Sequence, residues 1–555
     1  MLRKHGFHSL LVCCLTLCLT VCPCPVAAAA ASPLCITVAA DTHLRCAADL
    51  SAPSAQYTEH LLDPHTFGYA STQGQMDHES EAILCAMLDA FAASDSPFLL
   101  IAGDLTCGRR ASHLRMAELL RRAEQVGGKQ IFVINGNHDC AAESGDNNIS
   151  MQEFREIYAQ FGYDEAIARD ADSASYAADL GETHRLLAVD SCIYGEDEGE
   201  ISESVLRFIL EQTEAAVRDG RTPIVMMHHS ILPHYAAQPM IDKYRRYARR
   251  FADSGIGIVL TGHIHANDIS CTRSDRGNLL YDIQTGSLIA SPNTYRTLTF
   301  GADGVQVRSR FVTQIDTSVL PATLTPTQKA MLADDFPAYA HAYFESGVGK
   351  WFNRNLGSVD RIARWFKLRD GTAAYNAANQ IMQNLGDALG QDIYGAEGSI
   401  ESALAPFGVD VPASRFQKPY QAAAAVMYGF FHGDEATVSG EENVRLLLRC
   451  LEGALLSAMQ NGVDDASLGS LIRSVTGKAA ALSASRRTDA LRDTAERMAL
   501  ALVQTAANGF TDDYSAPSDL DETLRFQENS GTAATHITAQ IFRLLLLFLK
   551  HLIYG

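Results

Sequence analysis

The motif Gly136-Asn137-His138-Asp139 follows the apolar run from Gln130 to Ile134. Four more short motifs follow apolar, strand-like runs in the same way: Asp41-Thr42-His43, Gly103-Asp104, His228-His229 and Gly262-His263-Ile264-His265. The runs before them are Leu34 to Ala40, Phe98 to Ala102, Pro223 to Met227 and Ile256 to Thr261. Chance easily produces one such motif, but five of them at strand ends indicate one shared site.

Helical patterns lie between these runs, with apolar residues at three- and four-residue spacing. They cover Glu79 to Ala93, Ser112 to Glu124, Ile201 to Val217 and Ile241 to Ala252. Strands alternating with helices predict a layered α/β fold. Ligands of such folds bind beyond the carboxyl ends of the strands, which is where the motifs occur.

The motifs combine carboxylates, one carboxamide and several imidazoles, the groups needed to hold two cations side by side. This mixture of ligands fits Mn, Fe or Zn, and the absence of cysteine from the motifs argues against a structural zinc site. Two adjacent cations can neutralise a phosphate ester, hold it in line and acidify a bridging water. The residues therefore predict a bimetallic site.

From Leu34 to Phe311 the chain resembles the calcineurin-like metallophosphoesterases, whose pattern is D-x-H, G-D, G-N-H-D/E, a strand-end His and G-H-x-H. The resemblance implies an α/β class fold, a four-layer α/β/β/α sandwich. It also implies that Asp104 bridges the two ions. The remaining ligands would be Asp41, His43 and His265 on one ion, and Asn137, His228 and His263 on the other.

His138 is adjacent to a ligand but is not a ligand in the family pattern. We expect its side chain to point toward the leaving-group oxygen of the substrate, with Asp139 orienting it and keeping it protonated. These two residues are the predicted catalytic pair. A metal-bridged hydroxide would attack phosphorus while His138 protonates the leaving group, so that no phosphoenzyme forms.

Three parts are expected along the chain: a signal peptide over 1–31, the metallophosphoesterase domain over 32–315 and a C-terminal all-helical domain over 325–555. Long helical patterns such as Glu441 to Gln460 and Arg486 to Ala507 predict the last part. The family resemblance gives no role for it, and we expect it to contribute no metal ligand.

The N-terminus has the pattern of an export signal: a basic start at Arg3 and Lys4, an apolar stretch and an alanine-rich end. Export would place the protein outside the cell, in the periplasm or in the cell envelope. A lipoprotein anchored at Cys22 is an alternative, ranked second because Val21 is larger than the residue usual before a lipidated cysteine. The apolar segment Ile541 to Tyr554 predicts a docked helix in preference to a membrane-surface helix.

The formal charge of −20 argues against nonspecific nucleic-acid binding, which depends on Lys and Arg. The expected substrate is a small phosphate ester, with a preference for phosphodiesters over phosphomonoesters. A surface scaffold protein with a vestigial metal domain is the alternative from another class, but all the ligands and His138 are present. The spacing of the cysteines identifies no disulfide pair, and the sequence leaves the oligomeric state open.

Overall fold

A computed structural model of the chain describes residues 33–50, 74–234, 238, 240–301, 304–356, 359–395, 397–434, 441–460, 463–477, 484–510 and 519–526. The predicted signal peptide, its alternative lipidation site at Cys22 and the C-terminal apolar segment lie outside these residues. Within them, no helix combines the length and the apolar character needed to cross a bilayer.

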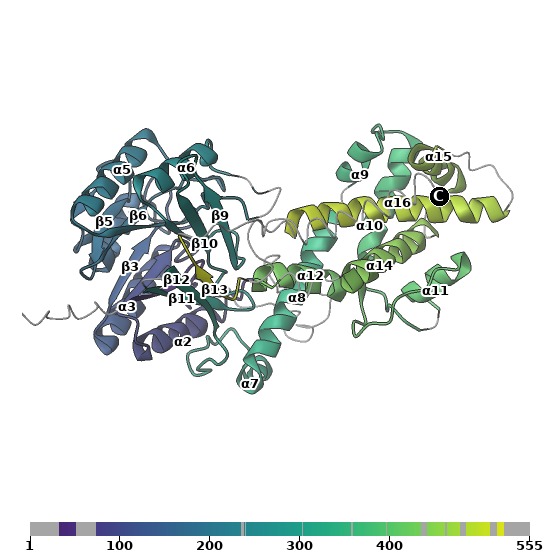
Figure 1. The fold of residues 1–555 in the computed structure, drawn as a ribbon. Helices are drawn as coiled ribbons and strands as arrows, with labels where there is room; N and C mark the ends of the chain where they lie inside the picture. The colour runs from purple at the N-terminus through teal and green to yellow at the C-terminus, as the bar shows by residue number, and fades with distance from the viewer. Residues whose placement is uncertain are drawn as a thin grey trace, which may run out of the picture.

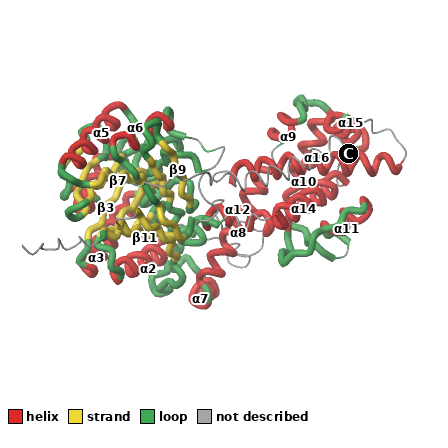
Figure 2. Tube along the Cα trace, viewed as in Figure 1, coloured by secondary structure: helices red, strands yellow, loops and turns green. Residues whose placement is uncertain are grey.

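Two mixed β-sheets form the N-terminal part of the molecule (Figures 1 and 2). The first sheet has the strand order β13-β12-β11-β1-β2-β3, and the second has the order β4-β5-β6-β7-β8-β10-β9. In the first, β1 (Leu34–Ala39), β2 (Phe98–Ala102) and β3 (Gln130–Ile134) are parallel, and β11 (Thr294–Gly301) and β12 (Gly304–Phe311) add an antiparallel edge. The second sheet contains β4 (Ala168–Arg169), β5 (Tyr176–Leu180), β6 (His184–Val189), β7 (Thr222–Met227), β8 (Ile258–Thr261), β9 (Asp268–Arg273) and β10 (Leu279–Gln284).

The central strands are continuously apolar because both of their faces are buried. In β7, Ile224 and Met226 belong to the core between the two sheets, whereas Val225 and Met227 pack toward the outer helices. Those helices are α5 (Glu203–Arg218) and α6 (Tyr244–Ser254) on the second sheet. Figure 1 shows α2 (Ser80–Ala93) and α3 (Arg110–Gly127) on the opposite side, beside the first sheet. The predicted two-sheet sandwich is confirmed.

The remaining segments of the N-terminal part are the short helix α4 (Met151–Ile157) and the single-turn helix Ala159–Tyr163. From Pro326 onward the chain is largely helical, as predicted. Its helices are α7 (Pro326–Asp334), α8 (Phe336–Leu356), α9 (Asp360–Trp365), α10 (Ala373–Leu389), α11 (Ile400–Leu404), α12 (Pro419–His432), α14 (Glu441–Gln460), α15 (Asp465–Thr476) and α16 (Ala484–Phe510). These helices enclose a second core, which includes Ile381, Leu451 and Met498.

One strand in the C-terminal part was not foreseen. Strand β13 (Asp521–Leu524) pairs antiparallel with β12 and becomes the edge of the first sheet. Figure 1 shows β13 on the sheet sandwich, beyond the end of α12. The chain therefore leaves the N-terminal sandwich before α7 and returns to it at β13.

Candidate metal and catalytic site

The motifs meet at one edge of the sandwich because parallel strands end at the same side of a sheet. Hydrogen bonds connect the loops that follow the strands: the Asp41 N–H donates to the carbonyl of Gly103 over 3.2 Å, and the Gly262 N–H donates to the carbonyl of His228 over 3.0 Å. The His263 N–H donates to the Asp41 carboxylate at 2.9 Å. Hydrogen bonds thus join the loops from both sheets at one site.

Five of the predicted ligands have a left-handed backbone conformation that side chains other than glycine rarely adopt. Their φ angles are 50° at Asp41, 36° at His43, 50° at Asp104, 76° at His263 and 64° at His265. Each such residue costs about 1–3 kcal/mol, and such residues cluster at functional sites, where the surrounding structure compensates the strain. The strain is concentrated at the positions that the motifs identify.

One group of side chains contains Asp41, His43 and His265, all buried, with ligand atoms within 4.8 Å of one another. The Nε2 atoms of His43 and His265 lie 3.2 Å apart, and the His265 Nε2 lies 3.3 Å from an oxygen of Asp41. Burial lowers the pKa of His43 to about 3 although Asp104 opposes this shift. A neutral imidazole keeps a lone pair for a cation, so this donor set fits a metal ion.

A second group contains Asp41, Asp104 and His228, again buried and within 4.8 Å. The His228 Nε2 lies 3.3 Å from Asp104 Oδ2 and 3.0 Å from the amide oxygen of Asn137. The other ring nitrogen, Nδ1, donates to the carbonyl of Ala102 at 2.9 Å and so directs Nε2 into the site. The two adjacent groups fit a dinuclear metal site.

Asp104 belongs to the second group and adjoins the first, and Asp41 belongs to both groups. The Oδ2 atom of Asp104 is 3.5 Å from His43 Nε2 and 3.3 Å from His228 Nε2, whereas Oδ1 accepts the His138 N–H at 2.9 Å. This position fits the bridging role that the resemblance implies for Asp104, which stays a prediction. A Cβ atom at position 136 would lie 2.1 Å from Asp104 Oδ1, so only glycine allows the two loops to approach this closely.

His263 is outside both groups but adjoins the second. Its ring centroid lies 5.1 Å from that of His228 and 4.5 Å from that of His229. Burial lowers the pKa of His263 to about 4. His229 itself is buried, and its Nδ1 lies 2.9 Å from the hydroxyl of Ser191, a contact that no sequence pattern predicts. The roles of His263 and Asn137 as ligands stay predictions.

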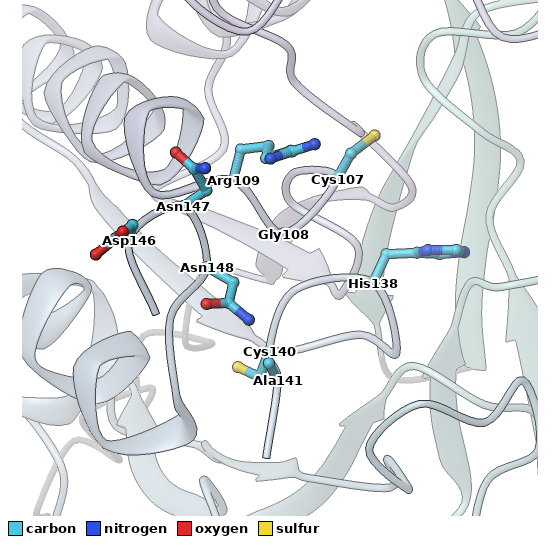
Figure 3. A pocket seen from close by; sticks show the side chains of 9 residues that line it. All are labelled: Cys107, Gly108, Arg109, His138, Cys140, Ala141, Asp146, Asn147 and Asn148. Carbon is cyan, nitrogen blue, oxygen red and sulfur yellow. The ribbon is translucent and has the colours of Figure 1, made fainter. Parts of the chain in front are cut away.

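His138 is exposed at the edge of a cavity of about 530 Å³. Its ring centroid lies 5.4 Å from that of His43, so the ring stands next to the first group without belonging to it. Figure 3 shows His138 on one side of the cavity and Arg109 and Asn147 across from it. The cavity is lined by Cys107, Gly108, Arg109, His138, Cys140, Ala141, Asp146, Asn147 and Asn148.

The structure gives Asp139 different partners from the one we expected. Its Oδ1 accepts the Thr106 N–H at 2.9 Å, and its Oδ2 accepts the N–H groups of Leu105 at 3.1 Å and Gly136 at 2.9 Å. Burial raises the pKa of Asp139 to about 7, and the charge of Asp104 adds to this shift. The buried carboxylate therefore joins the loops after β2 and β3, and its oxygens are occupied by main-chain donors instead of His138.

The described cysteines are free thiols. Cys107 lies nearest the site, with its sulfur 3.9 Å from Nδ1 of His43. Burial raises the pKa of this thiol to about 12, so it is protonated near neutral pH. As a neutral thiol it lines the cavity beside His43.

Residues 35–267 match the family model described as calcineurin-like phosphoesterase. A relative in Haemophilus influenzae, named 3',5'-cyclic adenosine monophosphate phosphodiesterase CpdA, is 24% identical over 214 residues, which are 37% of this chain and 68% of that protein. Similar solved structures include a dimetal phosphatase from Danio rerio, with 12% identity over 50% of this chain and 96% of that one and a TM-score of 0.36. Another is the purple acid phosphatase PPD1 from yellow lupin seeds, with 12% identity over 51% of this chain and 52% of that one and a TM-score of 0.33.

The buried groups of ligand atoms lie inside the range that matches the family. Both groups consist of side chains between Asp41 and His265. Residues 35–267 are therefore a calcineurin-like metallophosphoesterase domain, and the protein that contains it is a metal-dependent hydrolase.

Proposed function

We propose that the protein is an exported phosphodiesterase that works with two ions of Mn, Fe or Zn. The observation that carries the preference for diesters is the cavity of about 530 Å³ beside His138. A phosphodiester differs from a monoester in having a second organic group on phosphorus, and this cavity offers room for it. The polar side chains of Arg109, Asn147 and Asn148 favour a polar group there.

In the proposed reaction, His138 is the proton donor and Asp104 is the predicted bridging ligand of the two cations. Bound cations would supply positive charge for the phosphate and an acidified water. His138 stands between the buried groups and the cavity, where its imidazole can donate a proton to the departing oxygen. The hydrogen bond from its N–H to Asp104 Oδ1 fixes the main chain of His138 relative to the predicted bridging carboxylate.

Two further points support this proposal. The relative in Haemophilus influenzae is named as a phosphodiesterase of a cyclic nucleotide, although the identity of 24% is low. Export is supported by the sequence of residues 1–31 alone: Arg3 and Lys4, the apolar stretch and the alanine-rich end. Mass spectrometry of the native N-terminus tests export, since an intact Met1 on a cytosolic protein would contradict it.

A substrate panel tests the diesterase activity. Purified protein with Mn, Zn or Fe is assayed on matched pairs of esters, such as a nitrophenyl phosphate and the corresponding alkyl nitrophenyl phosphate. A higher kcat/KM for the diester supports the proposal, and a higher value for the monoester identifies a phosphomonoesterase. Activity on neither class in the metal-loaded protein would contradict both.

The cavity gives a second test through Arg109, whose exposed side chain lines it. Arg109→Ala is expected to lower kcat/KM for diesters with a polar or anionic leaving group by about tenfold, the equivalent of one hydrogen bond to a charged group. The matched control is Arg122→Ala, because Arg122 is exposed on α3 and does not line the cavity. Equal values of kcat/KM for the two variants would show that the cavity does not bind the substrate.

A further inference from the structure

The loop that carries His263 and His265 ends against the helical part of the chain. Asn267, two residues after His265, is buried and meets the last turn of α12. The carbonyl of Phe431 accepts the main-chain N–H of Asn267 at 3.3 Å and its side-chain Nδ2 at 3.2 Å. The carbonyl of His432 lies 3.4 Å from the same Nδ2. Main-chain carbonyls left without partners at the end of α12 are therefore used to hold this loop.

Asn267 also bonds to the loop after β10, which reaches the ligands. Its side-chain oxygen accepts the Gly286 N–H at 3.0 Å. The next residue, Ser287, donates its N–H to the carbonyl of His265 at 3.3 Å and its hydroxyl to the carbonyl of Asp41 at 2.9 Å. The contact with α12 is thus connected by hydrogen bonds to the main chain of two members of the first metal group.

The end of α12 is itself fixed on the sheet sandwich. The ring of His432 stacks on Phe311 of β12, with centroids 5.2 Å apart and planes 5° from parallel. The Asp519 N–H donates to the carbonyl of Gly433 at 2.8 Å, two residues before β13 begins its pairing with β12. Figure 1 shows α12 and β13 meeting the sandwich at this boundary.

A buried arginine lies among the same segments. Burial lowers the pKa of Arg296 to about 10, and the charges of Asp519 and Asp268 oppose this shift. Asp268 follows Asn267 directly, and Asp519 is the residue that binds Gly433. The buried positive charge therefore attracts both the end of the metal loop and the segment that leads into β13.

Gly433 sets how closely α12 can approach the loop. It ends the helix with φ of 82°, and a Cβ atom there would lie 2.8 Å from the carbonyl oxygen of Asn267 and 3.0 Å from its Cβ. Any larger residue must push Asn267 away or move α12. This close approach is specific, because Gly477 ends α15 with φ of 71° and has nothing within 4 Å of the corresponding position.

We propose that the helical region clamps the metal site, with Asn267 and Gly433 as positioning residues for His265. The inference rests on the proposed dinuclear site and adds a role for the C-terminal half of the chain. It also implies that residues 34–316 alone lack part of what holds His265 in place. The helical region supplies no ligand in this account, but it determines how tightly the ion held by Asp41, His43 and His265 binds.

The test compares Gly433→Ala with Gly477→Ala in the full chain. Both substitutions place a Cβ atom on a left-handed helix end, so both carry similar backbone strain. Binding of Mn²⁺ to the metal-free proteins is measured by titration, with the electron paramagnetic resonance signal reporting free Mn²⁺. Gly433→Ala is expected to lower the affinity for one of the two ions by on the order of 10- to 100-fold. This is the usual effect of disturbing residues that support a metal ligand. Gly477→Ala is expected to bind like the wild type.

Asn267 gives an independent test if Gly433→Ala fails to fold. Asn267→Asp keeps an oxygen that accepts the Gly286 N–H but loses the side-chain donor to α12, which also bonds to Thr294 at 2.9 Å. Asn267→Ala loses the side-chain oxygen as well, and the main-chain N–H that donates to Phe431 remains in both variants. We expect weakened binding of one ion in both variants, with the larger loss in Asn267→Ala. Circular dichroism confirms that each variant is folded before titration.

The outcomes separate this inference from the proposed function. The clamp is supported if the wild type binds two Mn²⁺ ions and Gly433→Ala binds one of them with lower affinity. Two ions bound equally tightly by the wild type, Gly433→Ala and the Asn267 variants would overturn it and leave the proposed function intact. A folded wild type that binds no ion would instead refute the dinuclear site itself.

Discussion

The Nε2 atoms of His43 and His265 lie 3.2 Å apart although 222 residues separate them along the chain. Both rings are buried, and the Asp41 carboxylate lies beside them. Two imidazole nitrogens and a carboxylate that converge in this way can share a cation. The strained backbone at these residues is explained if metal binding is what the arrangement serves.

Asp104→Asn is expected to weaken the binding of both ions, since Asp104 Oδ2 lies between His43 and His228. Losing a ligand costs at least as much affinity as losing a supporting residue, on the order of 10- to 100-fold. Metal content is measured by mass spectrometry after dialysis against a fixed Mn²⁺ concentration. Asp190→Asn is the matched control: Asp190 is a buried aspartate after a strand, and it bonds to Asn135 and to main-chain N–H groups. Equal metal content in the two variants would contradict the assignment of Asp104.

His138→Ala is expected to slow the hydrolysis of alkyl esters much more than that of nitrophenyl esters. A general acid contributes typically 10²–10⁴-fold, and nitrophenolate leaves without this help. The comparison is of kcat for one alkyl and one nitrophenyl ester with wild type and variant. Metal stoichiometry serves as the control and should stay at the wild-type value. Equal losses on both esters would argue against proton donation, and loss of an ion would make His138 a ligand.

Asp139→Asn is expected to lower stability without the leaving-group dependence of His138→Ala. The substitution replaces one carboxylate oxygen with an NH₂ group that faces main-chain donors, and an unsatisfied buried group costs about 1–3 kcal/mol. Denaturant unfolding measures the loss. If Asp139→Asn instead reproduced the ester selectivity of His138→Ala at unchanged stability, the originally expected pairing with His138 would be restored.

Glu79→Gln is expected to flatten the pH dependence of stability between about pH 4.5 and 7. Burial raises the pKa of Glu79 from 4.5 to about 7, although the hydroxyl of Tyr339 donates to it at 2.9 Å. The folded chain then holds a proton that the unfolded chain has released, so stability falls as pH rises through this window. Thermal unfolding of wild type and Glu79→Gln across the window measures the two slopes. Parallel curves would show that Glu79 ionises normally in the folded protein.

The strands and the ligand cluster were predictable because buried parallel strands are apolar throughout and end in polar motifs. The predicted bounds of β2 and β3 are the observed ones. Strand β9, with the sequence Asp268–Arg273, was missed because its polar residues Asp268, Ser270, Thr272 and Arg273 give no apolar run. Strand β13 was missed for a similar reason, since Asp-Glu-Thr-Leu has little strand propensity and depends on its partner β12.

Long-range partners left no signal in the sequence. Adjacency suggested that Asp139 serves His138, but the turn directs the carboxylate into the protein toward Leu105 and Thr106. Asn267 and Phe431 are 164 residues apart, and neither belongs to a recognisable motif. The glycine at position 433 resembles any helix-ending glycine until the neighbouring loop is seen.

The most direct test of the dinuclear site is a crystal structure of the protein grown with Mn²⁺, using anomalous scattering at the Mn edge. We expect two anomalous peaks roughly 3.5–4 Å apart, the usual separation in two-metal sites. Asp104 should lie between them, with Asp41, His43 and His265 around one peak and Asn137, His228 and His263 around the other. A single peak, or peaks away from these side chains, would contradict a dinuclear site at these residues.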